Sequence, residues 1–202
     1  AALLAPVALA ASNSDCETAL NKRDLVGAKG ICTQALASQK AAASGNTPAQ
    51  LETLARAHDN LGSLSMLNQQ YREAETHYRA SLAVRTRAYG KNHHNLSHSL
   101  VPLAESLVRL NQPSDAEKLL IQTLQLRQQA LGKRSEAVAR IHGTLATFYI
   151  RTNQMAKAQR QLADQISILE QLYPTGATAT AKAYNSLAVV RKKEGQLPQA
   201  EA

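Results

Sequence analysis

The sequence has no tryptophan, and aromatic residues of all kinds make up only 3% of it. β-Sandwiches and barrels rely on aromatic and β-branched side chains, so this scarcity disfavours them. Apolar residues make up 44% of the 202 residues, and alanine and leucine dominate them. Both are strong helix formers, so the composition predicts an all-α fold.

Acidic residues are also in short supply. The chain has 15 Asp and Glu against 23 Lys and Arg, which gives a formal net charge of +8. Such an excess favours an anionic partner, namely nucleic acid, an anionic membrane or an acidic protein. Charge alone does not choose among these three.

The common motifs of catalysis and metal binding are missing. The chain has no glycine-rich phosphate loop, no serine nucleophile motif and no His-Glu-x-x-His motif. His94 and His98 are four residues apart, but no Cys, Asp or Glu nearby completes a metal site with them. We therefore expect no enzyme activity, no small-molecule substrate, no cofactor and no metal.

The first twelve residues carry no charge. This run is shorter than the roughly 20 apolar residues that span a bilayer. It is typical of the apolar part of a secretory signal peptide, with Ala8-Leu9-Ala10 as the cleavage site. We interpret residues 1–12 as a signal-peptide remnant, which predicts a periplasmic or secreted protein. The alternative is an apolar capping helix on a cytoplasmic protein.

Several residue types recur every 42 residues, which is the signature of a repeat protein. Each recurring leucine is followed by glycine or alanine, and each recurring glutamine is preceded by a residue that tolerates a tight turn. The columns are Leu61, Leu103, Leu145 and Leu187; Gln70, Gln112, Gln154 and Gln196; and Ala74, Ala116, Ala158 and Ala200.

Each repeat is predicted to contain two amphipathic helices, which we name helix A and helix B. In the first complete repeat the apolar spacing places helix A at about 47–68 and helix B at about 71–89. Gly90 and Gly132 follow their B helices at the position where a left-handed cap is needed.

These residues carry a family resemblance. The 42-residue repeat is similar to that of kinesin-light-chain-like tetratricopeptide repeat (TPR) proteins. The resemblance covers roughly 47–202 and implies a right-handed superhelical solenoid of antiparallel helix hairpins, with A helices lining the inner face. His94 and Pro102 depart from the subclass pattern. The matching residues are Asn60-Leu61-Gly62, Tyr71, Ala74, Tyr78 and Ser81-Leu82, followed by Ala83-Val84-Arg85 and Tyr89 to His93.

The repeat register divides the chain into units 47–92, 93–134 and 135–176 and an incomplete unit 177–202. A degenerate first hairpin occupies 13–46, with helices at about 14–23 and 25–42, and 43–49 forms a loop. The last repeat is expected to expose an apolar face around Leu187, Val190 and Leu197.

The two cysteines lie in the degenerate hairpin. Cys16 and Cys32 are equidistant from Asp24 at the turn, and they correspond to Gly62 and Tyr78 of the next repeat. We expect a disulfide between them if the protein is exported. Two buried free thiols are the alternative.

Basic residues form two columns on one face of the A helices. The helical period directs this face away from helix B. In the resembled family it lines the concave groove, so the resemblance implies a ligand wall on which Asn60 and Asn185 bind peptide backbone. The first column is Arg56, His98, Arg140 and Lys182. The second column begins with an apolar residue, Leu67, and continues with Arg109, Arg151 and Lys193; Glu105 lies on the same face.

The predicted function is a non-enzymatic scaffold that binds a peptide or protein segment, acidic in character, along this face. Two alternatives stay open: the basic columns are simply solvated, or the terminal apolar faces drive self-assembly. Nucleic acid is disfavoured because the face lacks stacking aromatics. A membrane surface is disfavoured because no predicted helix combines a basic face with exposed large apolar residues.

Overall fold

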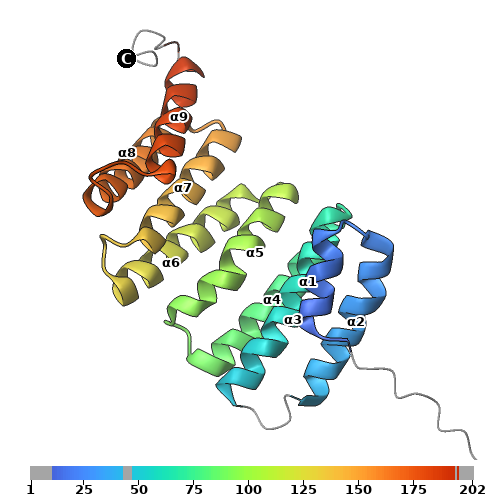
Figure 1. Cartoon of the computed structure of the whole chain (residues 1–202). Coiled ribbons are helices and arrows are strands. Elements are labelled where there is room, and N and C mark those ends of the chain that lie inside the picture. The colour runs from blue at the N-terminus through green and yellow to red at the C-terminus, as the bar shows by residue number, and fades with distance from the viewer. Residues whose placement is uncertain (1–10, 43–46, 194, 196–202) are drawn as a thin grey trace, which may run out of the picture. The chain divides into compact units, whose positions relative to one another are not determined.

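The computed structural model describes residues 11–42, 47–193 and 195. Within these ranges the secondary structure is helical with no strands, which confirms the all-α prediction (Figure 1). The first hairpin contains α1 (Asn13–Asn21) and α2 (Leu25–Ala42), and the second contains α3 (Pro48–Leu67) and α4 (Tyr71–Tyr89). These bounds match the predicted helices within two residues. Thr47 caps α3, so the predicted loop 43–49 is shorter than expected.

The remaining helices continue the pattern of A and B helices. A short 3-10 helix, η2 (His94–Leu96), precedes α5 (Ser97–Arg109), and α6 (Pro113–Leu131) follows. The third repeat contains α7 (Glu136–Arg151) and α8 (Met155–Leu172), and α9 (Thr178–Lys193) is the A helix of the last repeat. The predicted cleavage site at residues 8–10, as well as Leu197 and Ala200, lies outside the described residues.

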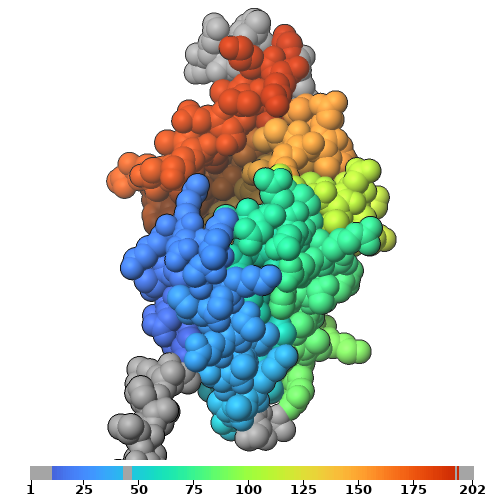
Figure 2. Space-filling view, turned by 90° about the vertical axis from the view of Figure 1, so that its right-hand side faces the viewer, coloured from blue at the N-terminus to red at the C-terminus, as the bar shows by residue number. Residues whose placement is uncertain are grey.

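The helices belong to two compact units, which meet in sequence between Leu110 and Asn111. The first unit contains α1–α5 and the second contains α6–α9. In the first unit α3 packs against α1, α2 and α4. The space-filling view shows the blue surface of the first hairpin next to the green surface of α4, with little of α3 visible between them (Figure 2).

The turns between A and B helices share one backbone conformation. The residue before each recurring glutamine has a positive φ, a region that favours Gly and Asn. This preference accounts for Asn at two of the four positions and Gly at a third. The residues are Gln69 (60°), Asn111 (61°), Asn153 (58°) and Gly195 (77°), and Arg23 (56°) takes the same conformation in the first hairpin.

The glycines after the B helices are C-caps, as predicted. Gly90 has a φ of 85°, and its N–H donates to the carbonyl of Thr86. Gly132 has a φ of 78°, and its N–H donates to the carbonyl of Gln128. With ψ of 169° and 158°, neither glycine has the left-handed helical conformation that the sequence predicts. Each has a positive φ, which glycine tolerates, and its N–H satisfies a helix carbonyl that would otherwise lack a partner.

The recurring leucines and alanines are core residues. Leu61, Leu103, Leu145 and Leu187 are all buried, with at most 9% of each exposed. Ala74, Ala116 and Ala158 are completely buried. The prediction that these columns occupy equivalent core positions is confirmed for the described residues.

The prediction that Leu187 and Val190 form an exposed apolar face in the last repeat is wrong. Leu187 and Val190 are buried, since α9 packs on α8 through the side that carries them. The large apolar side chains that α9 exposes are instead Tyr184 (48%) and Val189 (51%). A helix that packs on one neighbour buries one side only, so the exposed apolar residues come from its other sides.

The hairpin interface pairs a small residue on helix A with a larger one on helix B. A Cβ atom on Gly62 would lie 2.6 Å from Cε1 of Tyr78, so the ring in its present position leaves no room for a side chain at position 62. In the third repeat the corresponding residues are Ala146 and Leu162, both buried. The smaller leucine leaves room for the methyl group of alanine.

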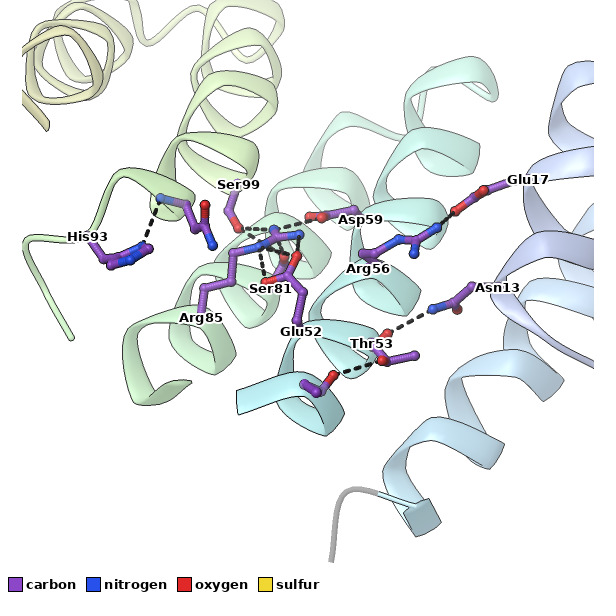
Figure 3. A network of polar contacts seen from close by, with 12 residues as sticks. Asn13, Glu17, Glu52, Thr53, Arg56, Asp59, Ser81, Arg85, His93 and Ser99 are labelled. Carbon is purple, nitrogen blue, oxygen red and sulfur yellow. Dashed lines mark hydrogen bonds and ion pairs between the residues drawn. The ribbon is translucent and has the colours of Figure 1, made fainter. Parts of the chain in front are cut away.

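A buried ionic network holds α3, α4 and α5 together in the first unit (Figure 3). The side chain of Arg85 is 2% exposed and pairs with Glu52 at 2.8 Å and Asp59 at 2.7 Å. Its Nη1 also donates to the hydroxyls of Ser81 and Ser99. Burial alone would lower the pKa of Arg85, but the two carboxylates outweigh it and raise the pKa. The arginine therefore remains charged, because its buried charge is paired.

The first hairpin is closed by a disulfide between Cys16 and Cys32, whose Cα atoms are 4.8 Å apart. Both cysteines are buried in a cluster that also contains Leu36, Leu61 and Leu64. The bond joins α1 to α2 at the positions that correspond to Gly62 and Tyr78. A covalent bond thus replaces side-chain packing where α1 is short.

We predict that Gly62→Ala destabilises the first unit unless Tyr78 is changed with it. The added methyl group overlaps the ring, and overpacking of this kind costs about 1–3 kcal/mol, partly offset by the ~1 kcal/mol higher helix propensity of alanine. Gly62→Ala with Tyr78→Leu reproduces the Ala–Leu pair of the third repeat. A double-mutant cycle in urea should therefore give a favourable coupling energy. Strictly additive effects would contradict this account of the interface.

We also predict that reductant destabilises the protein through the Cys16–Cys32 bond alone. Closing a loop of this length stabilises a fold by about 3 kcal/mol in the chain-entropy model. The variant Cys16→Ala with Cys32→Leu carries the residue pair of the third repeat. Its denaturation midpoint should be the same with and without dithiothreitol, whereas the midpoint of the wild type should fall. A wild type that is insensitive to reductant would refute the stabilising role of the bond.

Candidate functional site

The first unit contains a groove of about 750 Å³ on the face predicted to bind ligand. We name it the α3–α5 groove. Its walls combine apolar, hydroxyl and charged side chains and include three residues of the predicted face, Asn60, Leu67 and Arg109. The lining residues are Glu17, Leu20 and Asn21 of α1; Arg23 of the turn between α1 and α2; Asn60, Ser63, Met66 and Leu67 of α3; Tyr78 of α4; and Arg109 of α5.

The predicted basic residues of this unit are largely neutralised within the unit itself. Arg56 forms an ion pair with Glu17 at 2.6 Å (Figure 3). Arg109 pairs with Glu105 at 3.2 Å and lies over the ring of Tyr71, 5.8 Å from its centroid. A cation that already has a carboxylate partner gains less from a second one, so Arg109, the predicted cation that lines the groove, is only weakly selective for acidic ligands.

The second unit contains a groove of about 400 Å³ between α7 and α9, which we name the α7–α9 groove. It brings together two predicted cations, Arg140 of α7 and Lys182 of α9, and both are exposed. No acidic residue lines it, and neither cation forms an ion pair within the ranges that the structure describes. The other lining residues are Gly143, Thr144, Ala146, Thr147, Ile150, Leu162, Gln165, Ala183 and Ser186.

Arg140 lies near a second arginine, Arg127, and also near Tyr173, whose hydroxyl donates to Glu136. The pKa of the nearby Arg127 is lowered by burial first and then by the charge of Arg140. A like charge at close range disfavours the protonated form of its neighbour. An anion bound at Arg140 would relieve this repulsion.

Three hydroxyl groups in the α7–α9 groove are oriented by their own helices. Thr144, Thr147 and Ser186 each donate a hydrogen bond of 3.0 Å to the backbone carbonyl four residues earlier. Because their protons are used in this way, the hydroxyl oxygens present lone pairs to a ligand. They are therefore suited to accept hydrogen bonds from the N–H groups of a peptide.

The other predicted site residues are not brought into the two grooves. Arg56, His98, Arg151, Asn185 and Lys193 are exposed, and Glu105 is partly exposed, but none of them lines either groove. His98 and Arg151 have interactions with other parts of the protein. Asn60 donates weakly to the backbone carbonyl of Asn13 at 3.4 Å, so part of its hydrogen-bonding capacity is already used.

Sequence reasoning missed several lining residues. Thr144 and Ser186 lie 42 residues apart and four residues after Arg140 and Lys182, so the repeat register contained a signal for them. Glu17 carries no such signal, because it belongs to the degenerate hairpin, whose register is displaced.

No cluster of three or more His, Cys, Asp or Glu side chains that would hold a metal occurs among the described residues. Near the predicted pair of histidines, His93 stacks on His94 and accepts a hydrogen bond from the N–H of Asn95. No described helix has the length and apolar character needed to cross a membrane.

Comparison with known proteins identifies the repeats. Residues 53–129 match the sequence profile of the tetratricopeptide repeat family. No curated protein sequence matches the chain.

Solved structures share the fold over nearly the whole chain. BtubC (BKLC) from P. vanneervenii has a TM-score of 0.78 at 18% identity, over 93% of this chain and 73% of its own. A putative kinesin light chain from Podosopora anserina has a TM-score of 0.77 at 17% identity, over 94% and 88% of the two chains. YrrB, a TPR protein described as having an unusual peptide-binding site, has a TM-score of 0.51 at 17% identity, over 93% and 78%.

Identities this low establish the fold and nothing further. The fold is a TPR-like solenoid of helix hairpins, and proteins built from such repeats generally serve as scaffolds for protein interactions. The repeats of residues 53–129 belong to the tetratricopeptide repeat family, and the chain has the fold of its kinesin-light-chain-like members.

Proposed function

We propose that this protein is a non-enzymatic scaffold that binds an acidic peptide or protein segment, and that the α7–α9 groove selects the acidic residue. The observation that carries the proposal is that Arg140 and Lys182 line one groove, in which no carboxylate of the described residues takes part. Two cations that form no ion pair with the described part of the chain create a local field that favours an anion.

The chemistry of the groove fits a peptide carboxylate better than a free inorganic anion. Arg140 can bind a carboxylate through two parallel hydrogen bonds, and Lys182 adds a point charge. The hydroxyl oxygens of Thr144, Thr147 and Ser186 accept from backbone N–H groups. Ala146, Ile150 and Ala183 supply an apolar surface for a neighbouring side chain.

The α3–α5 groove has a different part in this proposal. The carboxylate of Glu17 lines it and Arg109 is paired with Glu105, so it contributes shape and apolar contact through Leu20, Met66 and Leu67 more than charge selection. The description of YrrB as a peptide-binding TPR protein supports a peptide ligand in general. It says nothing about the acidity of the ligand in this chain.

We also propose that the protein works in an oxidising compartment, as a periplasmic or secreted protein. Support comes from the uncharged residues 1–12 and from the disulfide between Cys16 and Cys32. Structural disulfides persist in such compartments and are rare in the reducing cytosol.

We predict that Arg140→Glu with Lys182→Glu weakens binding of an acidic peptide by about 100-fold or more, because each charge-assisted hydrogen bond contributes about 1.5–3 kcal/mol. The probe is a dye-labelled pool of Asp- and Glu-rich peptides, measured by fluorescence anisotropy. An Asn- and Gln-rich pool of the same length serves as the neutral counterpart. Binding of the acidic pool should also weaken with added salt.

The matched control is Arg72→Glu with Arg79→Glu, which makes the same change in net charge on the exposed side of α4. It should leave binding within a few-fold of the wild type. Equal losses in both variants would mean that the net charge attracts the peptide and the groove does not. Equal binding of the acidic and neutral pools would rule out acidic selectivity.

Self-assembly is the second candidate function, and the exposed Tyr184 and Val189 of α9 favour it. Tyr184 is not a purely apolar surface residue, since its hydroxyl donates to Glu170 at 2.6 Å. That hydrogen bond reduces the gain from burying the ring in a dimer.

We therefore expect the protein to be monomeric over a wide range of concentration, as measured by size exclusion with light scattering. If a dimer forms through α9, Tyr184→Lys with Val189→Lys should restore the monomer, and salt should not weaken the dimer. Such a result would favour the structural role over the binding role.

A further inference from the structure

The side chain of Gln165 lines the α7–α9 groove although it starts from α8, a B helix. Its amide group lies against Gly143 of α7, which lines the same groove. A Cβ atom on Gly143 would lie 2.7 Å from Nε2, 3.0 Å from Cδ and 3.0 Å from Oε1 of Gln165. The amide therefore occupies the space in which any other residue at position 143 would place its side chain.

The repeat does not require this arrangement. The first complete repeat and the second repeat combine a larger residue on helix A with a short hydroxyl residue on helix B. The third repeat reverses the sizes, since a glycine on α7 leaves room for a long polar side chain on α8. The equivalent residues, two repeats and one repeat earlier, are Asp59 and Ser81, and Val101 and Thr123.

The amide of Gln165 has no hydrogen-bond partner within the ranges that the structure describes, and its side chain is partly buried. An amide in this position loses part of its hydration and gains nothing from the protein in return. Its N–H donors and its carbonyl acceptor are consequently open to a ligand. A ligand that hydrogen-bonds to both would gain free energy from them.

Gln165 also supplies a chemical function that the neighbouring hydroxyl groups lack. Thr144, Thr147 and Ser186 use their protons within their own helices, so they offer acceptors only. Among the uncharged side chains that line the described groove, Gln165 is therefore the remaining donor for a ligand carbonyl. The two cations of the groove can donate as well, but their charge favours a carboxylate.

We propose that Gln165 clamps the backbone of the peptide bound in the α7–α9 groove, and that Gly143 positions it there. Nε2 donates to a backbone carbonyl of the ligand, and Oε1 accepts from a backbone N–H. This inference rests on the proposed function, in which Arg140 and Lys182 select the acidic side chain. Gln165 recognises the polypeptide that carries this side chain, so the groove discriminates against anionic polymers without peptide groups.

Gly143 is a positioning residue that acts through Gln165. A methyl group at position 143 would displace the amide, because a distance of 2.7 Å between carbon and nitrogen is too short. The amide is the end of a flexible side chain, so it can rotate away without disturbing the helices. Alanine is also a better helix former than glycine. Gly143→Ala should therefore stabilise the fold while it weakens binding of the peptide.

The experiment measures binding of two dye-labelled anionic probes to the full chain by fluorescence anisotropy. One probe is the Asp- and Glu-rich peptide pool, and the other is an oligoacrylate of similar length, which has carboxylates and no peptide groups. Gln165→Thr, which copies the residue of the second repeat, should weaken binding of the peptide pool about 10-fold, the effect of one or two hydrogen bonds. Binding of the oligoacrylate should stay within a few-fold of the wild type.

Gly143→Ala should weaken binding of the peptide pool by a similar factor and raise the melting temperature by about 2–4 °C. In the Gln165→Thr background it should cause no further loss of binding, since no amide is left to displace. The matched control is Gly30→Ala in α2, where an added Cβ atom meets nothing within 4 Å. It should raise the melting temperature in the same way and leave binding unchanged.

The proposal is overturned if Gln165→Thr binds the peptide pool as tightly as the wild type. It is also overturned if this variant loses the oligoacrylate equally, or if Gly143→Ala weakens binding in both backgrounds, because residues 143 and 165 would then act on the shape of the groove. Acidic selectivity through Arg140 and Lys182 can survive each of these results. Conversely, equal binding of acidic and neutral peptide pools removes that selectivity, whereas a loss at Gln165→Thr still reports the backbone contact. A wild type that binds neither pool overturns both proposals.

Discussion

The structure depends on how closely helix A approaches helix B within a hairpin. Three pairs of residues, each separated by 16 positions, occupy this interface: Cys16 and Cys32, Gly62 and Tyr78, and Ala146 and Leu162. Where helix B carries a tyrosine, helix A has glycine, and where it carries leucine, helix A has alanine. Because protein interiors are close-packed, the summed volume of the two side chains is constrained more tightly than the volume of either side chain alone.

This constraint fixes the orientation of each A helix and thereby the direction of its other side chains. Once the small residue faces helix B, residues five before and six after the repeated leucine must lie on the side away from it. That is why Arg140 and Lys182, which are 42 residues apart, line the same groove. The charges on that side can vary freely, since they take no part in the packing.

Much of the fold follows from the sequence because it depends on local and periodic signals. The ends of α3 and α4, the left-handed turns at Gln69 and Asn111, and the glycine caps all follow from residues close in sequence. The candidate site is less predictable, because it depends on contacts between residues far apart. Arg56 is neutralised by Glu17, 39 residues away in a hairpin outside the regular register.

The same distinction explains why a pair of histidines at the α3–α4 interface, His58 and His77, carries no signal in the sequence. They are 19 residues apart, and only the antiparallel packing of α3 on α4 brings them together. The interface accepts His with His in one hairpin and His with Gln in another, and each pair forms a contact between ring nitrogen and partner across the two helices. A polar nitrogen that is partly buried costs free energy unless it has a partner, so the residue on helix A constrains the residue on helix B even where neither is apolar.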